Sequence, residues 1–257
     1  MPNQTPTVNI FEKAVRKVGR ILVRDFGEIE HLQFKSNKID DFIDQSYCNS
    51  KESLIETLKY YYPSTKLISE KEKEYTNDEV ILIQPLDGKE NFIHGIPNLS
   101  IIVSKIKNNK ITEAVIFNPI TNDFYWASEG MGAWCNNNRL RVSKRTKIDH
   151  CILGVQNENI INLNQKDKDN LISIEKKFIN IRKIGPDSID LAYVASGKFD
   201  ALVLLNSNLN NVGAGILLII EAGGKITDIN GKDWNLDSLN ILTANPIIHR
   251  EILIKKI

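Results

Sequence analysis

Residues 84–97 read Q-P-L-D-G-K-E-N-F-I-H-G-I-P and follow directly on the apolar run Val80–Ile83. This pattern predicts a buried strand that ends in a tight loop carrying the carboxylate of Asp87 beside Gly88. An Asp-Gly pair alone is typical of an ordinary turn. Its place after a buried strand also suits a metal or phosphate site, so the loop has two interpretations that the rest of the chain must separate.

The composition is that of a globular protein. The chain has 257 residues, of which 42% are hydrophobic and 25% charged, enough for a sizeable core. We expect a single domain over residues 1–257, with subregions of about 1–145 and about 150–257. The formal net charge is +1, so there is no bulk attraction to nucleic acid or membrane, although local basic patches can exist.

The three cysteines, Cys48, Cys135 and Cys151, are odd in number and form no C-x-x-C pair. This argues against a disulfide framework or a zinc site and fits a reducing compartment. The N-terminus has no signal-peptide pattern, and the apolar run Ile216–Ile220 is far too short to span a bilayer. We therefore expect a cytoplasmic protein.

The first half predicts helices followed by a meander of strands. Apolar residues at helical spacing indicate a helix over 8–26 that stops at Gly27, and a second helix over about 50–62 begins at Ser50. Short apolar runs then predict strands, and Asn108-Asn109 predicts a hairpin turn. The strands are expected at 66–68, 80–83, 99–105, 111–118 and 124–127.

The second half alternates strands and helices, which is typical of a layered α/β protein. The expected strands are 151–155, 181–183, 201–205 and 239–244. The expected helices are 166–178, 187–196, 211–222 and 247–256.

Four short signatures occur in order along the chain. They span residues 67–70, 83–92, 190–200, and 210–215 with Glu221-Ala222-Gly223-Gly224 behind them. Together they resemble the inositol monophosphatase family, most closely its bacterial SuhB-type members. In that family the second signature reads D-P-[IL]-D-G-T-x-N-F and the fourth reads W-D-x-A-[AG]-G followed by E-A-G-G. The resemblance covers nearly the whole chain.

The resemblance implies an α/β (α+β) fold, a layered αβαβα sandwich that is usually homodimeric. Family members hydrolyse small phosphate monoesters with Mg²⁺, which prefers oxygen ligands. Carboxylates hold the metals, and a threonine after the D-G pair helps to position the attacking water. Backbone N–H groups of the loop hold the phosphate, which here implies Gly88, Lys89 and Glu90.

Several family positions carry different residues in this chain. The implied metal ligands fall on Glu70, Gln84, Leu86 (through its backbone carbonyl), Asp87 and Asn211. The implied catalytic positions fall on Glu70, Asp87 and Lys89, which replaces the threonine. Lys71 replaces a second glutamate, Tyr47 replaces an upstream acid, and Leu204 replaces a glutamate that contacts substrate.

These changes remove negative charge from the site. Of six family acids this chain keeps Glu70 and Asp87, and it gains Lys71 and Lys89. Lysine offers only donors, and a like charge at ~4 Å costs roughly 4 kcal/mol at an effective dielectric of about 20. The sequence therefore predicts that Mg²⁺ binding is lost or weakened. A lysine can take the place of a cation, so we expect Lys89 to pair with Glu70 or Asp87.

Three functions follow from these residues, and whether the chain is an enzyme stays open. The first is a catalytically weak or inactive relative that is kept for binding. The resemblance to SuhB-type proteins implies association with RNA polymerase and elongation factors. The second is an active Mg²⁺-dependent phosphatase of inositol 1-phosphate or a similar small sugar phosphate. The third is a metal-free phosphate binder that uses Lys89.

Overall fold

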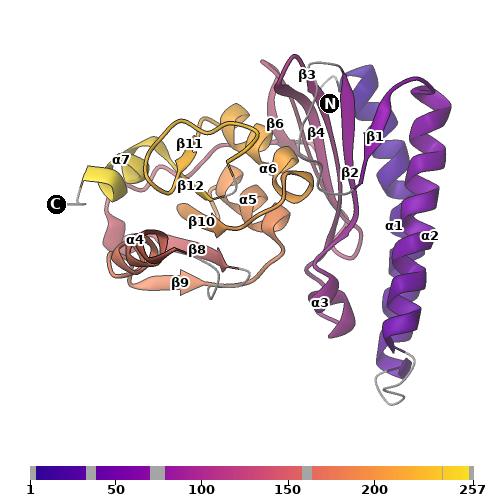
Figure 1. Ribbon diagram of the computed structural model, residues 1–257, viewed down its shortest axis with the longest axis horizontal. Coiled ribbons are helices and arrows are strands. Elements are labelled where there is room, and N and C mark those ends of the chain that lie inside the picture. The colour runs from indigo at the N-terminus through magenta and orange to yellow at the C-terminus, as the bar shows by residue number, and fades with distance from the viewer. Residues whose placement is uncertain (1–3, 33–38, 70–78, 158–163, 239, 255–257) are drawn as a thin grey trace.

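The computed structural model describes residues 4–32, 39–69, 79–157, 164–238 and 240–254. Two β-sheets alternate with three layers of helices, and the pair α1 and α2 forms one end of the molecule (Figure 1). None of the described helices combines the length and apolar character that a membrane crossing requires.

Helices α1 (Pro6–Leu32) and α2 (Ile39–Tyr61) are both longer than the sequence predicts. α1 continues past Gly27, since Ile29 is fully buried and its packing outweighs a glycine cost of about 1 kcal/mol. α2 begins at Ile39 rather than near Ser50, because Ile43 on its early turns is also fully buried. Both predicted helices are confirmed, and both predicted boundaries are wrong.

The first sheet has seven strands in the order β1 to β7. β1 runs parallel to β2, and each later strand pairs antiparallel with its neighbour, which confirms the predicted meander. Asn108 and Asn109 form the predicted turn with φ of 52° and 58°. The strands are β1 (Lys66–Ile68), β2 (Val80–Asp87), β3 (Ser100–Lys107), β4 (Lys110–Asn118), β5 (Asp123–Ser128), β6 (Gly132–Cys135) and β7 (Asn138–Arg139).

The end of β2 shapes the loop over residues 84–97. A register shift lies between Gln84 and Asp87, and Pro85 sits in it, where its missing N–H is tolerated. Gly88 follows with φ of 90°, and a Cβ there would lie 3.0 Å from the Asn98 carbonyl oxygen. The chain then enters the short helix α3 (Lys89–Ile93). Only glycine suits this turn without strain.

The second sheet has five strands in the order β11-β12-β10-β8-β9. Its strands are β8 (Ile152–Asn157), β9 (Asn180–Arg182), β10 (Ala201–Leu205), β11 (Lys225–Asp228) and β12 (Ile241–Ala244). Helices α5 (Asp187–Ala195) and α6 (Leu209–Glu221) pack between the sheets, and α4 (Gln165–Glu175) and α7 (Pro246–Ile254) cover the far face. A 3₁₀ turn at Ile148–His150 precedes β8.

Three apolar cores lie between these layers and hold them together. One joins α1 and α2 to the first sheet, one joins both sheets through α5 and α6, and one lies under α4 and α7. The predicted αβαβα sandwich is confirmed.

Candidate functional site

Asp87 stands at the junction of three elements. It ends β2 and is 6% exposed. Its Oδ2 accepts from Ser188 Oγ at 2.6 Å and from Ser188 N at 3.2 Å, in the first turn of α5. Ser188 Oγ also lies 2.7 Å from Ser100 Oγ at the start of β3. A carboxylate at a helix N-terminus satisfies an otherwise unpaired N–H and complements the helix dipole.

A second set of hydrogen bonds joins Asp87 to α6. Asn211 Nδ2 donates to Asp87 Oδ1 at 3.3 Å, and Gln84 Nε2 donates to Asn211 Oδ1 at 2.9 Å. An ionised carboxylate only accepts, so the amide nitrogen of Asn211 must face Asp87. The amide oxygen of Asn211 then has to accept from Gln84. The three side chains thus form one ordered hydrogen-bonded chain.

Asn210 holds α6 against the strand ends. Its side chain is 1% exposed, and Nδ2 donates to the carbonyls of Ile68 at 2.9 Å and Ile83 at 3.2 Å. These contacts tie the end of β1 and the middle of β2 to the start of α6, so they fix where Asn211 lies.

Lys89 pairs with a carboxylate on α2. Its Nζ lies 2.8 Å from Asp44 Oδ1 on α2, and the two side chains are 49% and 70% exposed. This hydrogen bond raises the pKa of Lys89, but an exposed pair contributes at most about 1 kcal/mol. Among the described residues Lys89 thus pairs with Asp44 and not with Asp87, whereas the expected alternative partner, Glu70, lies outside them. Asp44 is within reach because α2 begins at Ile39, before Asp44, rather than near Ser50.

The other predicted positions divide into three groups. Glu70 and Lys71 lie outside the described residues. Leu86 is 3% exposed at the end of β2, beside Asp87. Tyr47 packs against the core under α1 and α2, and Leu204 is fully buried in the core between the sheets. Leu204 therefore cannot contact a ligand in the cleft.

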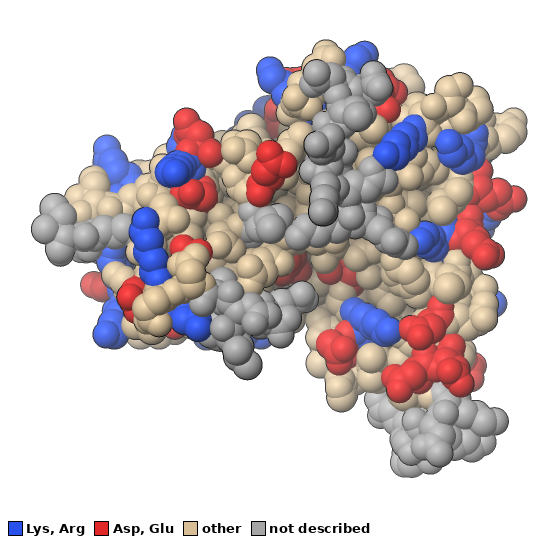
Figure 2. All heavy atoms as spheres, in the orientation of Figure 1, with Lys and Arg blue, Asp and Glu red and all other residues tan. Residues whose placement is uncertain are grey.

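A cleft of about 380 Å³ lies beside this network, between α3 and the segment that leads from β9 into α5. Figure 2 shows a notch in the outline between these two parts of the molecule. Asp87, Gly88, Lys89 and Glu90 line one side, and residues 183–187 line the other. The structure thus gathers most of the predicted loop residues around one opening.

Sequence reasoning gave no role to Asp190, although it begins the third signature. It is fully buried on α5, and Gln156 Nε2 donates to its Oδ2 at 2.8 Å. Burial raises the pKa of Asp190 to about 7; hydrogen bonds from Gln156 and the Gly185 backbone act against that rise, and the nearby charge of Asp87 adds to it. The apolar neighbours on its helix, residues 189 and 191–195, were the only available signal of burial.

The side chains of the described residues that could act as metal ligands fit a two-metal centre poorly. Asp87, Glu90 and Asp187 line the cleft. Within the described ranges, however, no three His, Cys, Asp or Glu side chains converge on one point that could hold an ion. The side chains of Gln84 and Asn211 offer amide oxygens without charge, and that of Asn211 accepts a hydrogen bond.

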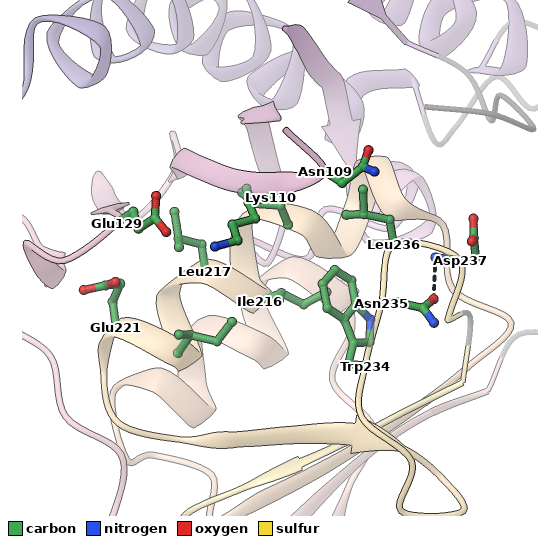
Figure 3. A pocket seen from close by; sticks show the side chains of 12 residues that line it. Asn109, Lys110, Glu129, Ile216, Leu217, Glu221, Trp234, Asn235, Leu236 and Asp237 are labelled. Atoms are coloured by element: carbon green, nitrogen blue, oxygen red, sulfur yellow. Dashed lines mark hydrogen bonds between the residues drawn. The ribbon is translucent and has the colours of Figure 1, made fainter. Parts of the chain in front are cut away.

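A second hollow of about 530 Å³ lies at the other end of α6 (Figure 3). Ile216 and Leu217 form part of its floor, Lys110 begins β4, Glu129 lies in the turn after β5, and Trp234 comes from the loop opposite. It adjoins Glu221, about 15 Å along the helix from Asn211. This hollow is separate from the cleft and adds no residue to it.

Comparison with known proteins supports one family. The family model described as "Inositol monophosphatase family" matches residues 3–257. A relative from Neisseria meningitidis serogroup B named "Putative Nus factor SuhB" is 33% identical over 255 residues, covering 96% of this chain and 97% of that protein. A Caulobacter vibrioides protein named "Inositol-1-monophosphatase" is 35% identical over 249 residues, covering 94% and 97%.

A solved structure agrees with these matches. The crystal structure titled "extragenic suppressor protein suhB" from Bartonella henselae superposes with a TM-score of 0.85 and 28% identity. The match covers 98% of this chain and all of that chain. The chain therefore belongs to the inositol monophosphatase family and is a SuhB-type member of it.

Proposed function

We propose that this chain is a SuhB-like regulatory protein in which a hydrogen-bonded network has replaced the metal centre. The observation that carries the proposal is the chain of contacts from Asp87 through Asn211 to Gln84. It joins the metal-loop carboxylate to two amides at the family's aspartate positions.

These hydrogen bonds are donated to the Asp87 carboxylate, and they therefore occupy the oxygens that a metal ion would need. Mg²⁺ needs oxygen ligands at close range, yet an N–H donor of Asn211 faces Asp87 Oδ1, and Ser188 donates twice to Oδ2. Metal binding through Oδ1 would have to break the Asn211 contact and reverse its amide. The network holds the loop, α5 and α6 together in the way that bound ions would.

The regulatory role is supported by relatives rather than by the cleft. Proteins named "Nus factor SuhB" or "Putative Nus factor SuhB" match over 90% or more of this chain. We extend from those names an association with the transcription machinery, through RNA polymerase and elongation factors. We also propose that the chain forms a homodimer, as the family resemblance implies.

A second candidate function is an Mg²⁺-dependent phosphatase of inositol 1-phosphate or a similar sugar phosphate. One observation favours it: Gln84 Oε1 is a buried oxygen without a hydrogen-bond partner among the described residues. A cation with Asp87 and the Leu86 carbonyl as further ligands would give that oxygen a partner. The 35% identical inositol-1-monophosphatase also supports this candidate.

Calorimetric titration with Mg²⁺ and a phosphatase assay with inositol 1-phosphate separate the two. The matched control is the triple variant Gln84→Asp, Lys89→Thr, Asn211→Asp, which restores the family residue at these three positions. We expect weak or no Mg²⁺ binding and background hydrolysis for the natural sequence, and tighter Mg²⁺ binding for the variant because it adds two carboxylates and removes a cation. Hydrolysis by the natural sequence at the rate of an active family enzyme would favour the second candidate.

The regulatory role has its own test. We expect immobilised protein to retain purified RNA polymerase with elongation factors, and the triple variant to retain them equally, because the proposed role does not use the cleft chemistry. Retention no better than that of an unrelated protein of similar charge would contradict the role.

A further inference from the structure

The outer face of α1 is strongly cationic. Between Lys13 and Arg24 the helix carries five cations and no carboxylate, namely Lys13, Arg16, Lys17, Arg20 and Arg24. At 3.6 residues per turn these positions fall within a sector of roughly 100° and extend over about 16 Å. They form a stripe along one face, on a chain whose net charge is only +1.

The stripe lines a groove rather than a flat surface. A hollow of about 930 Å³ lies between α1 and the end of α2, and one of about 520 Å³ lies between α1 and the turn after β4. Arg16 and Arg20 line both hollows, which are therefore adjacent along α1. We call this surface the α1 groove.

The charges along the α1 groove are only partly neutralised. Arg16 pairs with Glu12 at 2.7 Å, Lys17 with Glu56 at 2.7 Å and Arg24 with Asp25 at 2.7 Å. Their cationic side chains stay 37%, 49% and 67% exposed. The exposed side chain of Arg20 forms no hydrogen bond or ion pair with a described residue. With Lys59, six cations face three carboxylates.

Two tyrosines stand at one end of the α1 groove. Tyr60 is 81% exposed, the highest value among the large hydrophobic side chains of the described residues, and Tyr61 is 36% exposed. Their ring centroids are 4.9 Å apart, edge to face. Lys13 Nζ donates to the Tyr61 hydroxyl at 2.7 Å, which fixes that ring and leaves the Tyr60 ring open. An exposed ring beside a line of cations can stack an unpaired base.

We propose that the α1 groove binds single-stranded nucleic acid, with phosphates along the cations from Lys13 to Arg24 and a base stacked on Tyr60. Charge complementarity selects a polyanion, and the open ring favours unpaired bases over a duplex or an acidic peptide. The α1 groove shares no residue with the cleft, so this inference goes beyond the proposed function and does not depend on it.

Fluorescence anisotropy with a labelled mixed-sequence 12-nucleotide RNA and the matching DNA tests the proposal on the full chain. Both should bind at 50 mM salt and weaken at 200 mM, with a log–log slope of roughly −2 to −3.5 for three to five phosphate contacts. Arg20→Glu should weaken binding about tenfold or more and make the slope shallower. Tyr60→Ala should weaken binding about fivefold or more with the slope unchanged.

Lys166→Glu on α4 is the matched control, because it makes the same charge change at an exposed lysine outside the α1 groove. Thermal melts should show all three variants folded. The proposal is overturned by the absence of binding at 50 mM salt, or by an equal loss in Lys166→Glu and Arg20→Glu. The proposal is also overturned if a duplex binds as tightly as the single strand and Tyr60→Ala leaves the affinity unchanged. A polyglutamate peptide of equal affinity would assign the α1 groove to acidic proteins instead.

Discussion

At the scale of single residues, Asp190 makes the stability of the protein depend on pH. Its carboxyl group is fully buried and its pKa is raised to about 7. The folded state therefore holds a proton that the unfolded state releases near pH 4. The contribution of Asp190 to stability is present at acid pH and is lost as pH rises from about 4 to about 7. His249, whose pKa burial lowers to about 4, acts in the opposite direction up to about pH 6.5.

Asp190→Asn isolates the effect of the carboxyl group. At pH 3.5, where the carboxyl group is largely protonated in both the folded and the unfolded state, the variant and the natural protein should have similar free energies of unfolding, because neutral aspartic acid and asparagine are close in shape. At pH 8 the variant should be more stable, on the order of 1 to a few kcal/mol. Urea unfolding at both pH values measures this difference and cancels the contribution of His249. Asp237→Asn on an exposed loop is the control, and an equal difference at both pH values would contradict the expectation.

At the scale of elements, most helices and strands could be predicted from the spacing of their apolar residues. The boundaries could not, because they depend on burial against distant segments, as Ile29 and Ile43 illustrate. The contacts of the candidate site were out of reach for the same reason. Asp87 and Ser188 are 101 positions apart, and no local pattern marks Ser188. Lys89 was expected near Glu70 or Asp87 because a lysine can take the place of a cation, and the predicted second helix began too late to include Asp44.

Two helical glycines give opposite predictions for the same substitution. Gly27→Ala in α1 should raise the free energy of unfolding by about 0.5–1 kcal/mol, since a Cβ there meets nothing within 4 Å. Gly215→Ala in α6 should lower it by about 1–3 kcal/mol, because its Cβ would lie 2.6 Å from Leu191 Cδ1 on α5. Chemical denaturation measures both variants. Two changes of the same sign would mean that helix propensity alone, rather than α5–α6 packing, decides the outcome.

At the scale of the whole molecule, the two halves of the chain, about 1–145 and about 150–257, share one apolar core. The central core combines Ile102 and Ile116 of the first sheet with Ile216 of α6 and Leu202 of the second sheet. Asp200, 1% exposed, binds the segment between the halves, accepting from Arg145 Nη1 at 3.1 Å and from Ile152 N at 2.8 Å. We infer from this shared core that residues 1–257 fold as one cooperative domain.

A fragment of residues 1–145 tests that inference. It retains α1, α2 and the first sheet, but the face of the sheet that packs on α5 and α6 would lie open to water. A sheet needs cover on each apolar face, and an exposed apolar face of that kind promotes association. We expect the fragment to aggregate or bind a hydrophobic dye, without a cooperative thermal transition. The full chain should unfold in one transition seen alike by tryptophan fluorescence and far-UV circular dichroism. A fragment with native-like near-UV signal and its own sharp transition would instead make the halves separate domains.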